Sequence, residues 1–90
     1  MELKRVVVTG LGALTPIGNT KDEYWDALVS GKSGAAPVTH FDAEKFKTQF
    51  ACEVKNFEVT DFIDRKLARQ MDKFSQYAMV ASDEAIADAN

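Results

Sequence analysis

The chain opens with an apolar run that does not alternate with polar residues. Three adjacent valines occupy residues 6–8, so a strand over residues 3–14 would be apolar on both faces. Such a strand belongs inside a sheet that is covered on both sides. We therefore predict that residues 3–14 form an interior strand of a sheet larger than these residues can supply.

A long helix is predicted near the end of the chain, where apolar residues recur at steps of three and four. Large residues early in the helix give way to alanines later, so a neighbouring element can approach its last turns closely. Gly10 and Gly12 permit the same kind of close backbone approach from the first segment. The predicted apolar seam consists of Met71, Phe74, Ala78, Ala81, Ala85 and Ala89.

Residues 20–30 have the pattern of an amphipathic helix with a defined start and end. Thr20 and Glu23 have the spacing of a capping box. Gly31 is suited to the left-handed conformation that stops a helix. The predicted apolar face, which has helical spacing, consists of Tyr24, Trp25, Leu28 and Val29.

Two shorter elements lie between these helices. Phe50, Cys52 and Val54 alternate with more polar residues, which predicts a strand over residues 49–54 with one buried face. Asp64 is placed to cap a short helix over residues 65–71. The order of strand, helix, strand, helix and helix predicts a mixed α/β fold.

The composition sets limits on the function. With 90 residues and a net charge of −3, the chain suits one small domain and does not indicate a nucleic-acid partner, which would require a basic surface. No apolar stretch reaches the length of a membrane span, and no signal peptide is indicated. A single cysteine excludes an intrachain disulfide and agrees with a reducing compartment. We expect a cytoplasmic protein that does not act at a membrane.

A cluster of positive charge departs from this acidic background. It could be a solvated face balanced by Asp64 and Asp72, which is the usual role of charged runs. It could also be a surface for an acidic partner, because spacings of three and four place most of its members on one side of a helical segment. Four of the eleven basic residues fall within nine positions and form this cluster: Arg65, Lys66, Arg69 and Lys73.

Three other features invite a chemical role that the surrounding sequence does not support. Cys52 is expected to be buried and inert on the apolar side of its strand. His40 is the only histidine and lacks partners in the sequence, so a turn or packing role is expected. The pair Gly10 and Gly12 suggests a dinucleotide-binding turn, but Thr15 stands where that fingerprint requires glycine or alanine.

Many segments in succession resemble β-ketoacyl-acyl-carrier-protein synthases, most closely the synthase II type of fatty-acid elongation. Their order and spacing over nearly the whole chain make the resemblance specific. The resembling positions are 5–12, 16, 18–20, 25, 28, 31–34, 40–42, 54–55, 57, 65–66, 69, 71–72, 74 and 76–77.

The resemblance implies a thiolase-like α/β fold with layers in the order αβαβα, usually in a homodimer. Residues 1–90 would be the amino-terminal part of an incomplete ketoacyl synthase domain. The implied reaction is a decarboxylating Claisen condensation that uses one cysteine and two histidines and no dissociable cofactor or metal. Because the chain has a single histidine, it cannot hold that set. We expect it to contain no catalytic residue and to be inactive alone.

The resemblance also gives the basic cluster a partner. Synthases of this type bind the acidic acyl-carrier protein, loaded with an acyl or malonyl group, through a basic patch. Lys66 and Arg69 match positions of that patch, and Arg65 is a further contributor. Gln70 stands where some relatives have a lysine, which weakens the patch here. Two alternatives stay open: a polyketide-type ketosynthase, and a small non-enzymatic module that binds an acidic protein.

Overall fold

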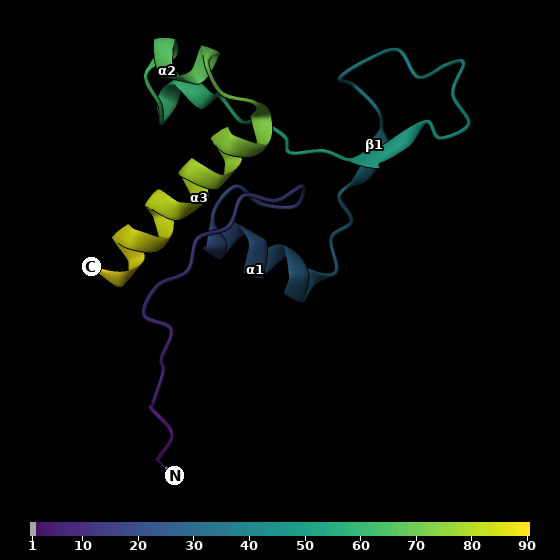
Figure 1. The fold of residues 1–90 in the computed structure, drawn as a ribbon. Coiled ribbons are helices and arrows are strands. Elements are labelled where there is room, and N and C mark those ends of the chain that lie inside the picture. The colour runs from purple at the N-terminus through teal and green to yellow at the C-terminus, as the bar shows by residue number, and fades with distance from the viewer. Residues whose placement is uncertain (1) are drawn as a thin grey trace.

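The computed structural model describes residues 2–90 and contains four helical segments and one small sheet (Figure 1). The longest helix runs diagonally through the molecule, with a compact helical cap at its beginning and the small sheet projecting to one side. In chain order the elements are α1 Lys21–Ser30, β1 Ala35–Pro37, β2 Phe50–Cys52, the 3-10 helix η1 Val59–Asp61, α2 Arg65–Arg69 and α3 Lys73–Ala89.

Helix α1 has the predicted limits. The Thr20 hydroxyl accepts a hydrogen bond from the Glu23 N–H at 3.2 Å. The Glu23 carboxylate reaches back to the Asn19 N–H at 3.0 Å, one residue earlier than a capping box requires. Gly31 ends the helix at φ 74°, in the left-handed region that favours glycine.

The predicted apolar face of α1 is not buried. Trp25 is 64% exposed and Val29 is 70% exposed. The buried residue of the helix is Ala27 instead. The periodicity correctly placed the apolar side chains on one face, but no element among residues 2–90 covers that face.

The predicted strand over residues 3–14 does not form a ladder. Residues 2–14 contain no strand, and the first part of this segment extends away from the helices (Figure 1). Val6 is 88% exposed and Val8 is 78% exposed. A strand needs a neighbour for its backbone hydrogen bonds. The sole sheet of the described residues consists of β1 and β2, so no such neighbour is present.

The end of this segment packs on α3 as the glycines predicted. A Cβ atom on Gly12 would overlap the Ala81 carbonyl oxygen, and one on Gly10 would overlap the Ala85 carbonyl oxygen. Residues 10–13, which we call the glycine segment, therefore contact the backbone of the alanine turns of α3 directly.

The predicted seam is wrong at Phe74 and Ala78, which are exposed, although Met71 packs against the core. Phe74 is 72% exposed, whereas Val80, which the seam omitted, is buried. The buried side of α3 is therefore rotated from the predicted one. Helix α3 packs against both the glycine segment and α2. These two contacts, and not the apolar pattern alone, determine which side of the helix is buried.

The small sheet is a two-stranded antiparallel ladder. Ala35 pairs with Cys52, and Pro37 pairs with Phe50. The sequence predicted the second strand but not the first, because β1 is three residues long and ends in a proline, which is confined to edge strands. The predicted inward face of β2 is reversed, since Phe50 and Cys52 are exposed and Ala51 is half-buried.

The core lies where α2, η1 and α3 meet. Ile63, Ala68 and Val80 are buried there. Phe57 stacks on Phe62 at 5.7 Å and meets Tyr77 edge-on at 5.6 Å between ring centroids, arrangements that aromatic pairs favour. Because Ala68 belongs to this core, the core anchors α2. None of the helices within residues 2–90 combines the length and the apolar character that crossing a bilayer requires.

Candidate functional site

Helix α2 is a short, firmly seated helix that presents its charged residues outward. Asp64 caps it, because its carboxylate accepts a hydrogen bond from the Lys66 N–H at 3.2 Å. Ala68 faces the core and is 4% exposed. With this one residue fixed in the core, the turns on either side of it place Arg65, Lys66 and Arg69 in solvent.

The basic cluster is divided between two helices, which agrees with the predicted short helix and the longer helix after it but not with one continuous helical face. Helix α2 ends at Arg69, and α3 begins at Lys73. The Gln76 side chain spans the break and donates hydrogen bonds to the carbonyl oxygens of Ala68 at 3.0 Å and Met71 at 3.4 Å. These bonds connect the first turn of α3 to the end of α2 and to Met71, two residues beyond it.

The break separates Lys73 from the other basic residues. Lys73 lines a cavity of about 190 Å³ together with His40 and Tyr77. The one-sided face that the spacing predicted is therefore wrong for Lys73. The basic face of α2 consists of Arg65, Lys66 and Arg69, and we call it the α2 basic face.

The α2 basic face is not neutralised by neighbouring acids. Within residues 2–90, no carboxylate lies within ion-pair distance of Arg65, Lys66 or Arg69. Asp64 is engaged in capping the helix. Among the described residues, neither Asp64 nor Asp72 forms an ion pair with the cluster, and exposed charges of this kind agree with a solvated face as well as with a surface for an acidic partner. Unpaired, exposed cations on a fixed helix are suited to long-range attraction of an acidic surface.

His40 lies in the loop after β1 and contacts a single acid. Its Nδ1 atom is 3.5 Å from a Glu53 carboxylate oxygen. The same carboxylate accepts hydrogen bonds from the Thr39 hydroxyl at 2.9 Å and from the His40 N–H at 3.3 Å. Partial burial raises the pKa of Glu53, but the hydrogen bonds from Thr39 and His40 outweigh it, so this pKa lies below its ordinary value. The carboxylate thereby fastens the loop to the strand that follows.

Cys52 does not occupy the buried position predicted for it. It is exposed at the end of β2. The alternation correctly predicts a strand. However, β2 pairs only with β1, and no other part of residues 2–90 covers the face that Cys52 shares with Phe50. Exposure alone does not activate a thiol as a nucleophile.

The glycine pair of the first segment does not form a nucleotide-binding turn. A dinucleotide turn passes directly into a helix whose N-terminus receives the phosphates. Here α1 begins at Lys21, nine residues after Gly12, and both glycines lie against α3. Their role is close packing.

Two polar arrangements were not predicted from the sequence. The Lys55 ammonium donates to three carbonyl oxygens, those of Pro16 at 3.2 Å, Gly34 at 2.9 Å and Glu53 at 3.1 Å. Glu84 and Asp88 on α3 bind the glycine segment and the start of α1. Apart from Lys55 and Glu53, which are two residues apart, the partners are 21 to 77 residues apart, so the sequence offers little local signal beyond the spacing of four between Glu84 and Asp88.

Comparison with known families identifies the chain. Residues 3–90 match the sequence profile of the family described as "Beta-ketoacyl synthase, N-terminal domain". The chain belongs to the β-ketoacyl synthase family.

Curated relatives of this β-ketoacyl synthase segment have a consistent name. The 3-oxoacyl-acyl-carrier-protein synthase 2 of Synechocystis sp. is 54% identical over 89 residues, which cover 99% of this chain and 21% of the relative. The protein of the same name from Vibrio harveyi is 47% identical over the same coverage. The chain therefore spans about a fifth of the length of the curated relatives it matches.

A solved structure places this segment within the fold. The ishigamide ketosynthase/chain length factor matches 92% of this chain with a TM-score of 0.84 and 41% sequence identity, and the match covers 21% of that chain. This match confirms the predicted α/β, thiolase-like fold class. It also supports the arrangement of α1, α2 and α3 as part of a larger ketosynthase architecture.

Proposed function

We propose that this chain is the amino-terminal part of a 3-oxoacyl-acyl-carrier-protein synthase, an acyltransferase of fatty-acid elongation. The observation that carries the proposal is identity of 47% and 54% to two synthases of this name across 99% of the chain. Residues 1–90 are accordingly an incomplete ketoacyl synthase domain. The full-length enzyme would act as a cytoplasmic homodimer, with neither a membrane nor a nucleic acid as partner.

The proposed reaction joins two thioesters with loss of carbon dioxide. An acyl group passes from the carrier protein's thiol to an enzyme cysteine. Malonyl-carrier protein then loses carbon dioxide, and the carbanion attacks the acyl thioester, so that a carbon–carbon bond forms and the enzyme thiolate leaves. His40 contacts Glu53 in a loop, and Cys52 is exposed at the end of β2. We propose that the catalytic residues lie outside residues 1–90 and that the reaction requires no dissociable cofactor or metal.

The part of the mechanism assigned to this chain is recognition of the acyl-carrier protein. The α2 basic face of Arg65, Lys66 and Arg69 is exposed and has no acid paired with it among the described residues. A rigid set of like charges accelerates encounter with an acidic partner and fixes its orientation. Gln70 follows directly, so the face carries no fourth cation at that position.

Charge reversal in the full-length enzyme tests this assignment. Lys66→Glu combined with Arg69→Glu should raise the KM for acyl-carrier protein by about tenfold at low salt, because attraction becomes repulsion. The rate with a small thioester that lacks the carrier protein should stay unchanged. A control pair, Lys45→Glu with Lys47→Glu, changes the net charge equally on the exposed loop after β1 and should leave both substrates unaffected.

The two substrates separate the possible outcomes. Equal loss of activity with carrier-bound and small thioesters would refute docking at the α2 basic face while leaving the synthase assignment intact. Absence of any condensation product in the wild-type full-length enzyme would refute the synthase itself. In that case, retained binding of carrier protein would favour the non-enzymatic module for an acidic partner.

A polyketide-type ketosynthase is the second candidate. The structural match to a ketosynthase/chain length factor favours it. Product analysis distinguishes the two functions, because an elongation synthase releases a product after one condensation. Products that grow by repeated condensation without intervening reduction would decide for the polyketide type.

A further inference from the structure

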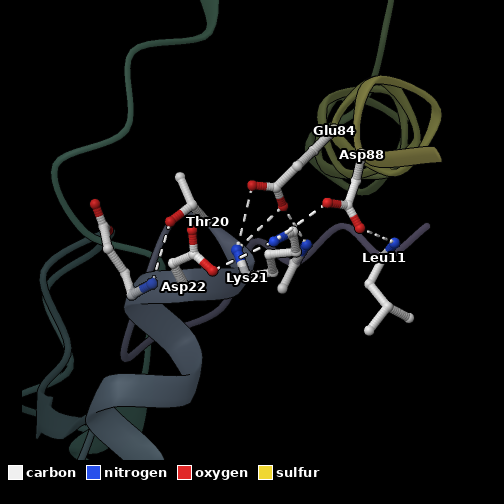
Figure 2. Close-up of polar contacts among 8 residues, drawn as sticks. Leu11, Thr20, Lys21, Asp22, Glu84 and Asp88 are labelled. Carbon is white, nitrogen blue, oxygen red and sulfur yellow. Dashed lines mark hydrogen bonds and ion pairs between the residues drawn. The ribbon is translucent and has the colours of Figure 1, made fainter. Parts of the chain in front are cut away.

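Helix α3 directs two carboxylates, one helical turn apart, toward the glycine segment and α1. Glu84 and Asp88 are separated by four residues and so project from the same side of the helix. Figure 2 shows both side chains reaching from α3 to the backbone of the first segment and to the start of α1. Each carboxylate has two or more partners, and none of those partners is on α3 itself.

Glu84 joins two segments with a single carboxylate. Its Oε1 atom accepts a hydrogen bond from the Ala13 N–H at 2.6 Å. The Lys21 N–H donates to both oxygens of the same carboxylate at 3.2 Å. Lys21 is the first residue of α1, and its N–H is among those that a helix leaves without an internal acceptor. A negative charge at this end of a helix is favourable.

Asp88 makes the parallel connection one turn later. Its Oδ2 atom accepts a hydrogen bond from the Leu11 N–H at 3.0 Å, and its Oδ1 atom lies 3.3 Å from the Lys21 ammonium. The Lys21 and Asp88 side chains are 32% and 33% exposed, respectively. Lys21 therefore contacts both carboxylates, one through its backbone and one through its ammonium group.

The glycines explain why the carboxylates can reach these N–H groups. Gly10 and Gly12 rest directly on the backbone of α3. Leu11 and Ala13, the residues that alternate with them, turn their N–H groups to Asp88 and Glu84. In a sheet, alternate N–H groups of this kind would bond to a neighbouring strand. Here the carboxylates of a helix take that place.

We propose that Glu84, Asp88 and Lys21 form a charge-dependent clamp that fastens the glycine segment and the start of α1 to α3. The clamp is closed while both carboxylates are ionised and Lys21 is protonated. Neutralising one carboxylate weakens its hydrogen bond to the backbone N–H and leaves the helices themselves intact. The proposal rests on the contacts of these residues and is independent of the proposed synthase activity.

The groups that face the clamp define its pH range. Lys21 and Asp22 face it from α1, and the glycine segment contributes only backbone N–H groups. The Leu11 N–H, followed by Lys21, holds the pKa of Asp88 below its ordinary value. Asp22, followed by Asp88, raises the pKa of Lys21. Asp88 therefore stabilises the clamp above about pH 4, and Lys21 stabilises it below about pH 10. The contribution of Asp88 is lost as the pH falls through its lowered folded value.

Amide hydrogen exchange in the full-length protein tests the clamp. Asp88→Asn should lower the protection factor of the Leu11 amide about five- to tenfold, because a charged acceptor becomes a neutral one. Glu84→Gln should have the corresponding effect at Ala13. Asp83→Asn is the matched control. Asp83 lies on the same helix and makes no hydrogen bond or ion pair within residues 2–90, so the control should change neither amide.

The wild-type protein provides a test that no folding defect can obscure. As the pH is lowered from 7 to about 3, protection at Leu11 should fall before protection at Val80, a core residue of the same helix. The clamp is supported if the Leu11 amide alone loses protection as the pH falls in the wild type, and if this pH-dependent loss is absent in Asp88→Asn. Parallel loss at Leu11 and Val80 would overturn the proposal, as would variants that leave the Leu11 and Ala13 amides at wild-type protection.

Discussion

Gly12 lies so close to Ala81 that a Cβ atom on the glycine would overlap the alanine's carbonyl oxygen. The overlap is with backbone and not with the tip of a flexible side chain, so α3 would have to move to accept a methyl group. We expect Gly12→Ala to destabilise the full-length protein by about 1–3 kcal/mol, the usual cost of overpacking. Chemical denaturation measures this change.

A second substitution shows whether backbone contact is the cause. Ala81→Gly removes the alanine's own methyl group but leaves its carbonyl oxygen in place. We therefore expect the double variant Gly12→Ala with Ala81→Gly to recover none of the lost stability. Substantial recovery would mean that side-chain crowding, and not the close backbone approach, makes glycine necessary at this position.

This contact was foreseeable from both of its partners. Gly10 and Gly12 predicted a segment that another backbone approaches, and the alanines of residues 78–89 predicted a helix surface that can be approached. The valines of residues 6–8 predicted a strand that needs further neighbours, and in the structure these valines are exposed. The size of a side chain limits how closely another segment can approach its position. Patterns of this kind correctly predicted the helices, the end of α1 at Gly31 and the close packing of Gly10 and Gly12 on α3.

The errors arose where an element's neighbours determine the outcome. Cys52 was expected to be buried, but alternation reveals only that two faces exist, not which face a neighbour covers. Lys73 was grouped with the residues of α2 because helical spacings of three and four were applied past the end of the predicted short helix, and α2 ends at Arg69. The contacts of Glu84 and Asp88 were not predicted, because their partners lie in distant parts of the chain.

The cap of α1 provides the second prediction. The Thr20 hydroxyl is the acceptor for the Glu23 N–H, so Thr20→Ala should cost about 1 kcal/mol of stability in the full-length protein. Thr20→Ser retains the oxygen and should recover most of that stability. Thr48→Ala, in the exposed loop before β2, is the control and should change the denaturation midpoint little. Equal effects of Thr20→Ala and Thr48→Ala would argue against a capping role.

The exposure of Cys52 provides the third prediction. Because β2 has a partner on one edge only and no cover over Cys52, iodoacetamide should alkylate this thiol in the 90-residue chain nearly as fast as in denaturant. Mass spectrometry at neutral pH measures the alkylation rate of the native and of the denatured chain. The two rates should differ by no more than about threefold. Circular dichroism of the same sample establishes that the helices are present. Protection of a hundredfold would instead indicate the buried position that alternation alone suggested.

Lys55 provides the last prediction. Its ammonium group joins the turn before α1, the loop after α1 and the end of β2 through the carbonyl oxygens of Pro16, Gly34 and Glu53. Lys55→Met keeps the length of the side chain but removes all three donors. Because Lys55 is exposed, water replaces part of each bond, and we expect a loss of about 1–2 kcal/mol in the full-length protein.

Two further variants separate the geometry of Lys55 from its charge. Lys55→Arg keeps the positive charge, but a planar guanidinium cannot direct donors at three carbonyl oxygens arranged around a compact ammonium, so it should recover less than half of the loss. Lys47→Met removes an exposed lysine with no hydrogen bond in residues 2–90 and should be neutral. Full recovery by arginine would show that charge alone matters. If Lys47→Met lowered the stability as much as Lys55→Met, both effects would reflect only the change in net charge. That result would refute the proposed role of Lys55 in joining the three segments.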